Sequence, residues 1–171
     1  VYYNKNVNDT ITTQLRNTHN YIKKHLINSV SNRNNTLIDY SVGMGGDLHK
    51  WNSAKLSFVY GRDISPDNIR NPKTSVCARY RNSYKKNPNL PKVLFSVAKT
   101  HLSIADGAAF DNDKDKQIAN ALFGKGPKDK KLLGEGVYNN YGVANKVFDI
   151  GSSQFTLHYY FETPTTLHTF L

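Results

Sequence analysis

Three closely spaced glycines followed at once by an acid form the part of the sequence best suited to bind a small molecule. They are Gly43, Gly45 and Gly46, with Asp47 directly after them, in the stretch LIDYSVGMGGDLHKW. The stretch begins as an apolar strand and returns to a helical pattern at Asp47. Glycines in such a turn let the backbone approach a ligand without a Cβ in the way, so this layout predicts a nucleotide-type site.

A second acid follows at the end of the next predicted strand. Asp63 closes the run FVYGRD, and it lies about 20 residues beyond Gly43, as does the ribose-binding acid of nucleotide folds. An acid in this place can accept hydrogen bonds from both ribose hydroxyls. The spacing from Gly43 to Asp63 therefore fits an adenosine-containing ligand.

The residues after the turn distinguish between adenosine-containing ligands. A dinucleotide fingerprint needs a glycine three residues beyond its second one, but here Gly45 is followed by Gly46, Asp47 and Leu48. An acid at the helix start would repel a pyrophosphate, whereas Asp47 could hold the amino group of S-adenosylmethionine. Asp47 could also be an ordinary helix cap, and the two roles can coexist. The turn thus favours a methyltransferase over a nicotinamide-dependent dehydrogenase.

Alternating strand and helix patterns must position these residues. Short apolar or β-branched runs bounded by Gly, Asn, Pro or charge predict the strands, and helical patterns lie between them. Such alternation predicts an α/β fold with a parallel sheet. The expected strands are 36–41, 56–63, 93–98 and 147–153, and the expected helices between them are 47–54, 65–69 after a serine cap, and 74–86.

The first helix of the chain is predicted over residues 9–30. Apolar residues recur there at helical spacing, which indicates an amphipathic helix, and Asp9 or Thr10 is placed to cap its first turn. The apolar positions are Ile11, Leu15, Ile22 and Leu26.

Residues 111–146 differ in composition from the rest of the chain, being rich in Lys, Asp, Gly and Asn. We interpret them as an insertion or long loop with one helical piece, Lys116 to Phe123, and such a charge run is more typical of a solvated face than of a binding site. Neither an internal repeat nor a strong linker is visible. Residues 1–171 are therefore expected to form a single domain with 111–146 inside it.

The charge balance favours an anionic partner. Lys and Arg number 23 against 13 acids, a formal net charge of +10, which suits nucleic acid or phosphates, although a merely soluble basic protein is the alternative. The single cysteine, Cys77, and scattered histidines predict neither a disulfide nor a metal site. Because no long apolar run or signal peptide is visible, we expect a cytoplasmic protein without membrane contact.

Five segments, taken in order, resemble the mRNA cap guanine-N7 methyltransferase family. Several motifs in the right order are more specific than any one of them. The segment ALFGKGPKDKKLLGEGVYNNYG looks most like the versions encoded by large cytoplasmic DNA viruses. The resemblance implies a Rossmann-like class I methyltransferase sheet with strand order 3-2-1-4. The five segments are LRNTHNYIKKHLI, LIDYSVGMGGDLHKW, YGRDISPDNI, ARY and SSQFTLHYYFE, between Leu15 and Glu162.

The resemblance also implies roles for individual residues in methyl transfer from S-adenosylmethionine to capped RNA. Positioning alone is expected to serve this chemistry, so no catalytic residue is assigned. Phe155 could instead belong to the core, and a lone histidine before two tyrosines is commonly structural. The implied cofactor contacts are Lys23 on the methionine carboxylate, Gly43, Gly45 and Asp47 along the methionine and ribose, Asp63 on the ribose hydroxyls and Gln154 beside the cofactor; the implied cap-guanine contacts are Phe155, His158 and Tyr159.

Two features depart from the family pattern. Lys99, in VLFSVAKTHLSI, stands where the family has an acid that holds the adenine amino group, and lysine cannot accept that hydrogen bond. A backbone group or a hydroxyl such as that of Thr100 could read the adenine, or cofactor affinity is reduced, or the site has degenerated. The chain also stops at Leu171, shortly after the fourth predicted strand.

That second departure predicts a C-terminally incomplete domain. The fourth strand would then have an unpaired edge, which is an aggregation hazard unless something covers it. We therefore expect further polypeptide there, either the rest of a capping enzyme or a partner subunit. Because of both departures, an alternative hypothesis remains: a non-catalytic RNA- or cap-binding module that retains the methyltransferase fold.

Overall fold

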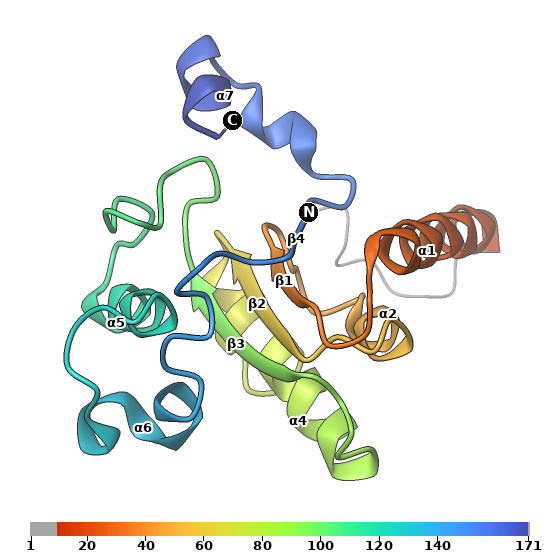
Figure 1. Cartoon of the computed structure of the whole chain (residues 1–171). Coiled ribbons are helices and arrows are strands. Elements are labelled where there is room, and N and C mark those ends of the chain that lie inside the picture. Colours follow the sequence, from red (N-terminus) through yellow and green to blue (C-terminus); the bar gives the residue numbers. More distant parts are fainter. Residues whose placement is uncertain (1–9, 171) are drawn as a thin grey trace.

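A computed structural model describes residues 10–170 and contains one four-stranded sheet. All strand pairs are parallel, and the strands lie in the order β3-β2-β1-β4 (Figure 1). This confirms the predicted α/β fold and strand order. The strands are β1 (Thr36–Asp39), β2 (Phe58–Asp63), β3 (Lys92–Val97) and β4 (Ile150–Ser152).

The sheet is most completely buried along its two central strands, β1 and β2. Every residue of β2 is buried, and Leu37 of β1 pairs with Val59 on one side and Ile150 on the other. The fourth strand is shorter than the predicted 147–153, since only Ile150 to Ser152 pair with β1. Within residues 10–170, β4 pairs with β1 alone, so its outer edge carries no strand there.

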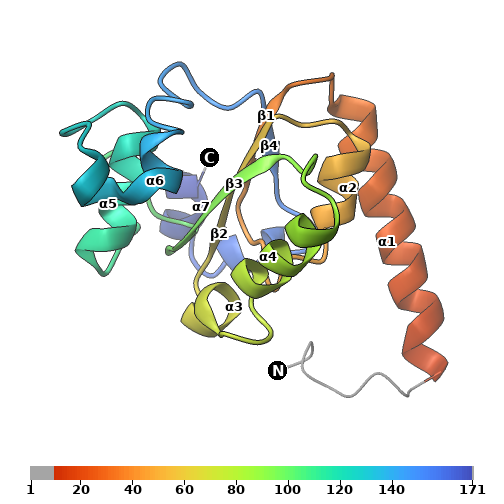
Figure 2. The same cartoon turned by 90° about the horizontal axis from the view of Figure 1, so that it is seen from below.

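Helices cover both faces of the sheet (Figure 2). One core cluster joins Leu37 and Val59 to Ile27, Trp51 and Val76, which come from helices on the first face. A second cluster on the opposite face packs Leu122 against alternate residues of β1 and β2. The first face carries α1 (Thr10–Val30), α2 (Leu48–Ser53), α3 (Pro66–Arg70) and α4 (Val76–Lys86), and the second carries α5 (Asp113–Leu122) and α6 (Lys130–Tyr138).

The predicted N-terminal helix is present, but its predicted apolar face is not buried. Leu15, Ile22 and Leu26 are exposed, while Ile27 is buried. The helix packs beside α2 at the margin of the molecule rather than flat on the sheet, so its apolar stripe meets little protein (Figure 2). Asp9 and the side chain of Ile11 lie outside the described residues.

Serine caps start the two helices between β2 and β3. The hydroxyl of Ser65 accepts a hydrogen bond from Asn68 N at 3.3 Å, as its place in the sequence predicts, and that of Ser75 accepts one from Ala78 N at 3.2 Å. The second cap makes α4 begin at Val76 rather than at Thr74. Both caps satisfy backbone donors that have no partner within the helix.

The insertion contains two helices, not the single one expected. The first begins at Asp113, earlier than predicted, because the side chain of Asn112 accepts a hydrogen bond from Asp115 N at 2.9 Å. The second, α6, is interrupted at Gly134 (φ 74°, ψ 160°), and its glycines have low helix propensity, which hides it from a propensity argument. An ion pair of 2.5 Å between Arg70 and Asp115 ties α5 to α3.

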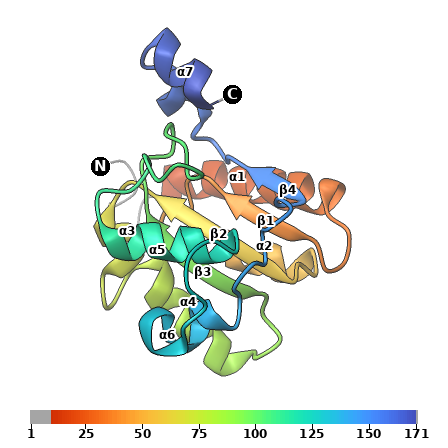
Figure 3. The same ribbon diagram turned by 60° about the vertical axis from the view of Figure 1, so that its left-hand side comes forward.

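Two short helical segments follow β4. They are a 3-10 turn, η2 (Leu157–Tyr160), and α7 (Pro164–Phe170). Figure 3 shows α7 projecting away from the sheet and its covering helices. No helix among residues 10–170 is long and apolar enough to span a bilayer.

Candidate functional site

The glycine turn between β1 and α2 opens a space beside bare backbone. Gly43 (φ 53°) and Gly45 (φ 78°) both adopt the left-handed conformation that favours glycine. A Cβ on Gly45 would lie 2.8 Å from Val76 Cγ2, so this glycine lets the turn pack closely on α4. A Cβ on Gly43 would meet nothing within 4 Å. The turn therefore offers a cradle that side chains do not fill.

Asp63 is fixed at the edge of this cradle. Its Oδ2 accepts a hydrogen bond from Gly43 N at 2.8 Å, which joins the ends of β1 and β2 as their sequence spacing predicts. Its Oδ1 accepts from Ser65 N at 2.9 Å and from Asn68 Nδ2 at 3.0 Å. A carboxylate has about four lone-pair sites, so one remains for a ligand. The sequence reasoning missed Asn68, whose signal is its place one turn into the helix that follows Asp63.

Asp47 binds two lysines instead of capping α2. Its Oδ2 lies 3.3 Å from Lys23 Nζ, and its Oδ1 lies 2.8 Å from Lys50 Nζ. Although Asp47 occupies the N-cap position, its side chain makes no capping hydrogen bond, so the capping alternative is wrong. One carboxylate between two ammonium groups leaves the cluster with a net positive charge, and Lys23 can therefore attract an anionic group.

Lys50 was missed by sequence reasoning, and it links three parts of the site. Its buried ammonium group contacts Asp47, donates to Gly46 O at 2.9 Å and donates to Asn20 Oδ1 on α1 at 3.0 Å. These three acceptors replace the water that burial removes. Lys50 thus holds α1, with Lys23 on it, against the glycine turn.

A third carboxyl group, that of Asp39, lies buried at the end of β1. Its Oδ1 accepts a hydrogen bond from Ser41 N at 3.1 Å. Burial, and then the neighbouring charge of Asp47, raise the pKa of Asp39 to about 7. In the sequence, the only sign of this group is that an acidic residue ends an apolar strand. The strand pattern did not predict a function for it.

Phe155 lies against α1 with one side exposed. Its ring stacks on His19 with 4.4 Å between ring centroids, and Lys23 Nζ lies 5.8 Å from its centroid. Because Phe155 is 42% exposed, it is not a core residue. The structure thus brings the predicted Phe155, Lys23 and Asp47 together, and adds His19, which the sequence reasoning missed.

The other predicted residues after β4 are less tightly placed. Gln154 Nε2 donates to Ser152 Oγ at 3.3 Å. The exposed rings of His158 and Tyr159 lie 4.1 Å apart on η2, and within residues 10–170 no hydrogen bond or ring contact joins them to the glycine turn. Tyr160 provides the link that they lack, because its hydroxyl lies 2.7 Å from Ser41 Oγ and its side chain is buried.

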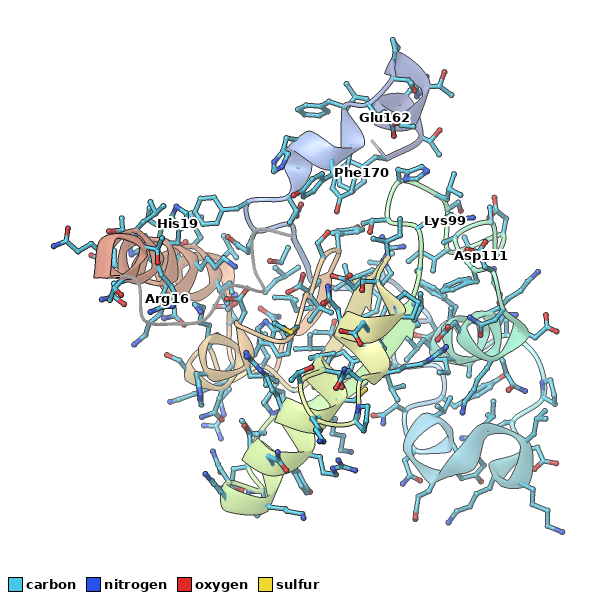
Figure 4. All side chains as sticks on the ribbon, turned by 180° about the vertical axis from the view of Figure 1, so that it is seen from behind. Arg16, His19, Lys99, Asp111, Glu162 and Phe170 are labelled. Atoms are coloured by element: carbon cyan, nitrogen blue, oxygen red, sulfur yellow. The ribbon has the colours of Figure 1, made fainter. Side chains whose placement is uncertain are left out.

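The position expected to hold an acid for adenine has a different arrangement. Lys99 Nζ lies 2.6 Å from Asp111 Oδ1. Thr100 Oγ1 donates to Tyr40 O at 2.9 Å, which leaves the lone pairs of the hydroxyl to accept a hydrogen bond. Figure 4 shows Lys99 and Asp111 on the side of the molecule opposite to Arg16 and His19. Among the residues that the structure describes, no group of three His, Cys, Asp or Glu side chains could hold a metal ion.

Comparison with known proteins extends this picture over the whole chain. The chain is 29% identical over 169 residues to a probable mRNA-capping enzyme of Acanthamoeba polyphaga mimivirus, which covers 99% of this chain and 13% of that protein. It is 37% identical over 68 residues to the mRNA cap guanine-N(7) methyltransferase of Eremothecium gossypii, covering 40% of this chain and 15% of that protein.

A plant relative matches a shorter part of the chain. It is the mRNA cap guanine-N(7) methyltransferase 1 of Arabidopsis thaliana, 29% identical over 80 residues, covering 43% of this chain and 22% of that protein. The chain therefore spans less than a quarter of the length of each of these relatives. A model of the mRNA (guanine-N(7))-methyltransferase domain matches residues 3–171. Together with the parallel sheet and the glycine turn, this match shows that the chain belongs to the mRNA (guanine-N(7))-methyltransferase domain family.

Proposed function

We propose that this chain is an S-adenosylmethionine-dependent methyltransferase domain that methylates N7 of the cap guanine of capped RNA. The observation that carries the proposal is the hydrogen bond from Gly43 N to Asp63 Oδ2, beside an unfilled glycine turn. This hydrogen bond places a carboxylate next to backbone that no side chain covers, and an adenosine-containing ligand needs both. The family match supports the same reaction.

The residues around the turn fit this cofactor. Asp63 keeps an acceptor site for the ribose hydroxyls, since its hydrogen bonds to protein use only part of its capacity. Lys23 has a side chain that is 22% exposed and can meet the methionine carboxylate while remaining near Asp47. Gly43 leaves room along the methionine and ribose, and Gly45 lets the turn that carries it pack on α4. We infer that Gln154, two residues after β4, lies beside the bound cofactor.

The chain's own residues act by orientation. When bound, S-adenosylmethionine supplies a methyl group that its sulfonium has already activated. N7 of guanine has an outward lone pair, so no base must remove a proton, and the protein has to hold the two reactants in line. Such positioning can lower a barrier by roughly 7 to 11 kcal/mol. Lys50 contributes by fixing α1 and Asp47 relative to the turn.

Exposed aromatic rings suit the other reactant. Guanine becomes cationic when N7 is methylated, and the faces of Phe155 and Tyr159 attract a cation. His158 can donate or accept a hydrogen bond at a base edge. Their exposure means that they are accessible to a nucleotide, and Tyr160 anchors their segment to Ser41.

Two further elements belong to the proposal. Since Lys99 is paired with Asp111 and the hydroxyl oxygen of Thr100 can still accept a hydrogen bond, we infer that the adenine amino group is held by a hydroxyl or backbone acceptor and not by a side-chain carboxylate. Among residues 10–170 no strand pairs with the outer edge of β4, and this supports our proposal that further polypeptide covers that edge.

A non-catalytic RNA- or cap-binding module is the second candidate, and the ion-paired Lys99 is the observation that favours it. Titration calorimetry with S-adenosylhomocysteine and a capped oligonucleotide, with a methyl-transfer assay, distinguishes the two. The methyltransferase binds both ligands and modifies the cap. Binding of capped RNA by a folded protein that does not bind S-adenosylhomocysteine would establish the module instead.

A further inference from the structure

Nearly all of the net charge of this protein comes from one stretch of sequence. Between Asp67 and Asp106 there is no acidic residue at all. The stretch contributes +8, whereas the whole chain has a formal net charge of +10. Its eight cationic residues are Arg70, Lys73, Arg79, Arg81, Lys85, Lys86, Lys92 and Lys99.

The helix α4 presents half of these cations to solvent without neutralising them. Arg79, Arg81, Lys85 and Lys86 are all exposed, and within residues 10–170 none has an ion pair or a side-chain hydrogen bond. The two lysines in the last turn are favourable to the helix dipole, but the two arginines lie too early for that explanation. Like charges four residues apart, such as Arg81 and Lys85, destabilise a helix. This uncompensated repulsion favours an anionic partner.

An exposed aromatic ring lies among these cations. Tyr84 is 46% exposed and stands beside Lys85, three residues after Arg81. Its ring stacks on that of Tyr80 at 5.7 Å, and the Tyr80 hydroxyl donates to Pro91 O at 3.0 Å. One face of the Tyr84 ring is thus covered by Tyr80, and the other face is exposed. Cations that alternate with a stacking surface suit single-stranded nucleic acid.

Other anionic partners fit α4 less well. A lipid surface requires exposed aliphatic side chains on the helix, but Val76 and Ala78 are buried. An acidic peptide would pair with the cations but would leave the face of Tyr84 unused. Nucleic acid uses both features, because its phosphates meet the cations and its bases stack on the ring.

The position of α4 connects it to the candidate site. Its first residue, Val76, packs against Gly45 in the glycine turn. From there the helix runs away from the carboxyl ends of the strands towards the start of β3 (Figure 1). A chain whose first nucleotide lies in the site could therefore continue along α4.

We propose that the α4 strip, meaning Arg79, Arg81, Tyr84, Lys85 and Lys86, binds the nucleotides of the RNA that follow the cap. Arg81, Tyr84 and Lys85 are neighbours at i, i+3 and i+4 on one side of the helix, and Arg79 and Lys86 lie together on the other side of its exposed surface, so the RNA backbone passes between the two groups. This inference rests on the proposed function, which supplies the capped end. The strip gives affinity that grows with RNA length and does not depend on base sequence. The cap itself is read elsewhere, by the residues after β4.

The insertion provides a contrasting basic surface on the opposite face. A groove of about 520 Å³ between α5 and α6 is lined by Lys114, Lys116 and Lys125, but also by Asp113. Lys125 donates to Ala105 O at 3.0 Å, and Lys130 pairs with Glu135 at 3.3 Å. Acids and existing contacts thus offset much of its charge, which makes it a matched control.

The test compares two quadruple variants in binding to a cap dinucleotide and to capped single-stranded RNAs of increasing length, at several salt concentrations. In the strip variant we expect the gain of affinity with length to fall at least about tenfold and the salt slope to fall by about 3, at roughly 0.7 per lost phosphate contact. Binding of the cap dinucleotide stays unchanged. The strip variant is R79Q/R81Q/K85Q/K86Q and the control is K114Q/K116Q/K125Q/K130Q.

Several outcomes would overturn the proposal. An equal loss in the control variant would show that total charge matters and that α4 has no special role. A strip variant that binds long RNA as the parent does would exclude RNA binding by the strip. A polyglutamate that competes as strongly as RNA of equal charge would show that the strip does not use the bases, and would overturn the assignment to nucleic acid. Circular dichroism establishes that both variants fold. Failure of the parent to bind S-adenosylhomocysteine and the cap dinucleotide would reject the proposed function instead, since the proposal places neither ligand on the α4 strip.

Discussion

The two halves of the candidate site are built in opposite ways. Around the glycine turn, Asp39, Asp47 and Asp63 are buried, and each is held by neighbouring donors. After β4, the rings of Phe155 and Tyr159 are exposed, and Phe155 adopts φ 58°. A left-handed conformation at a non-glycine residue costs on the order of 1 to 3 kcal/mol.

This difference shows what each half has to do. The buried half is rigid before any ligand binds, because moving a buried carboxylate would break several hydrogen bonds at once. The exposed half carries apolar rings and a strained residue that ligand contacts would stabilise. We therefore expect substitutions in the buried half to change stability and cofactor binding, and those in the exposed half to change recognition of the cap.

The largest effect should come from the buried carboxyl group of Asp39. Its pKa is raised from 3.8 to about 7, so the folded state holds a proton that the unfolded state releases between these values. The contribution of this proton to the free energy of unfolding is fully present below about pH 4. It is lost as the pH rises through 7, which lowers the free energy of unfolding by up to about 4 kcal/mol. Urea unfolding of the parent and of Asp39→Asn from pH 4 to 8 measures this difference.

The asparagine variant keeps an oxygen that can accept from Ser41 N, so it removes the charge but not the hydrogen bond. It should therefore lack this part of the pH dependence and exceed the parent in stability at pH 8. Parallel curves for the two proteins would contradict the burial of an ionisable group at this place.

The next effect concerns Asp63. Replacement by alanine removes the one acceptor site that Asp63 keeps for a ribose hydroxyl and should weaken S-adenosylhomocysteine binding by roughly 2 kcal/mol, the scale of a hydrogen bond to a charged group. Calorimetry measures the change, and circular dichroism checks that the variant keeps its secondary structure. Asp113→Ala, which removes an exposed carboxylate of α5, is the control. If folded Asp63→Ala binds S-adenosylhomocysteine with the affinity of the parent, the cofactor does not bind at this turn.

A smaller and different effect is expected from Phe155→Ala and Tyr159→Ala. Each should reduce discrimination between capped and uncapped RNA by about 1 to 3 kcal/mol, the scale of base stacking, without changing the salt slope. Binding of both RNAs at several salt concentrations tests this. Phe161→Ala removes an exposed ring from the same segment and should have no such effect. If either aromatic variant discriminates as the parent does, that ring plays no part in cap recognition.

The smallest effect should come from Lys99. A carboxylate there could accept from the adenine amino group, so Lys99→Asp should tighten S-adenosylhomocysteine binding by about 1 kcal/mol. Asp111→Asn in the same chain avoids repulsion between two acids, and Asp111→Asn alone is the control. Unchanged or weaker binding would mean that another group reads the adenine.

The strand order followed from the resemblance to the methyltransferase family, whereas the residue patterns of the sequence by themselves determined the parallel sheet and the meeting of Gly43 with Asp63. These features depend on short-range patterns, namely apolar periodicity, glycine spacing and the length of one strand-helix-strand unit. The serine cap of α3 was predictable for the same reason, since a cap acts over only three residues.

Only the tertiary structure decided the partners of Asp47, the stacking of His19 on Phe155 and the tie between Tyr160 and Ser41. Residues far apart in the chain make most of these contacts, so no local pattern specifies them. The raised pKa of Asp39 and the exposed apolar stripe of α1 likewise depend on what packs nearby. Burial is a property of the assembled fold, and local periodicity shows which face of a helix is apolar but not whether protein covers it.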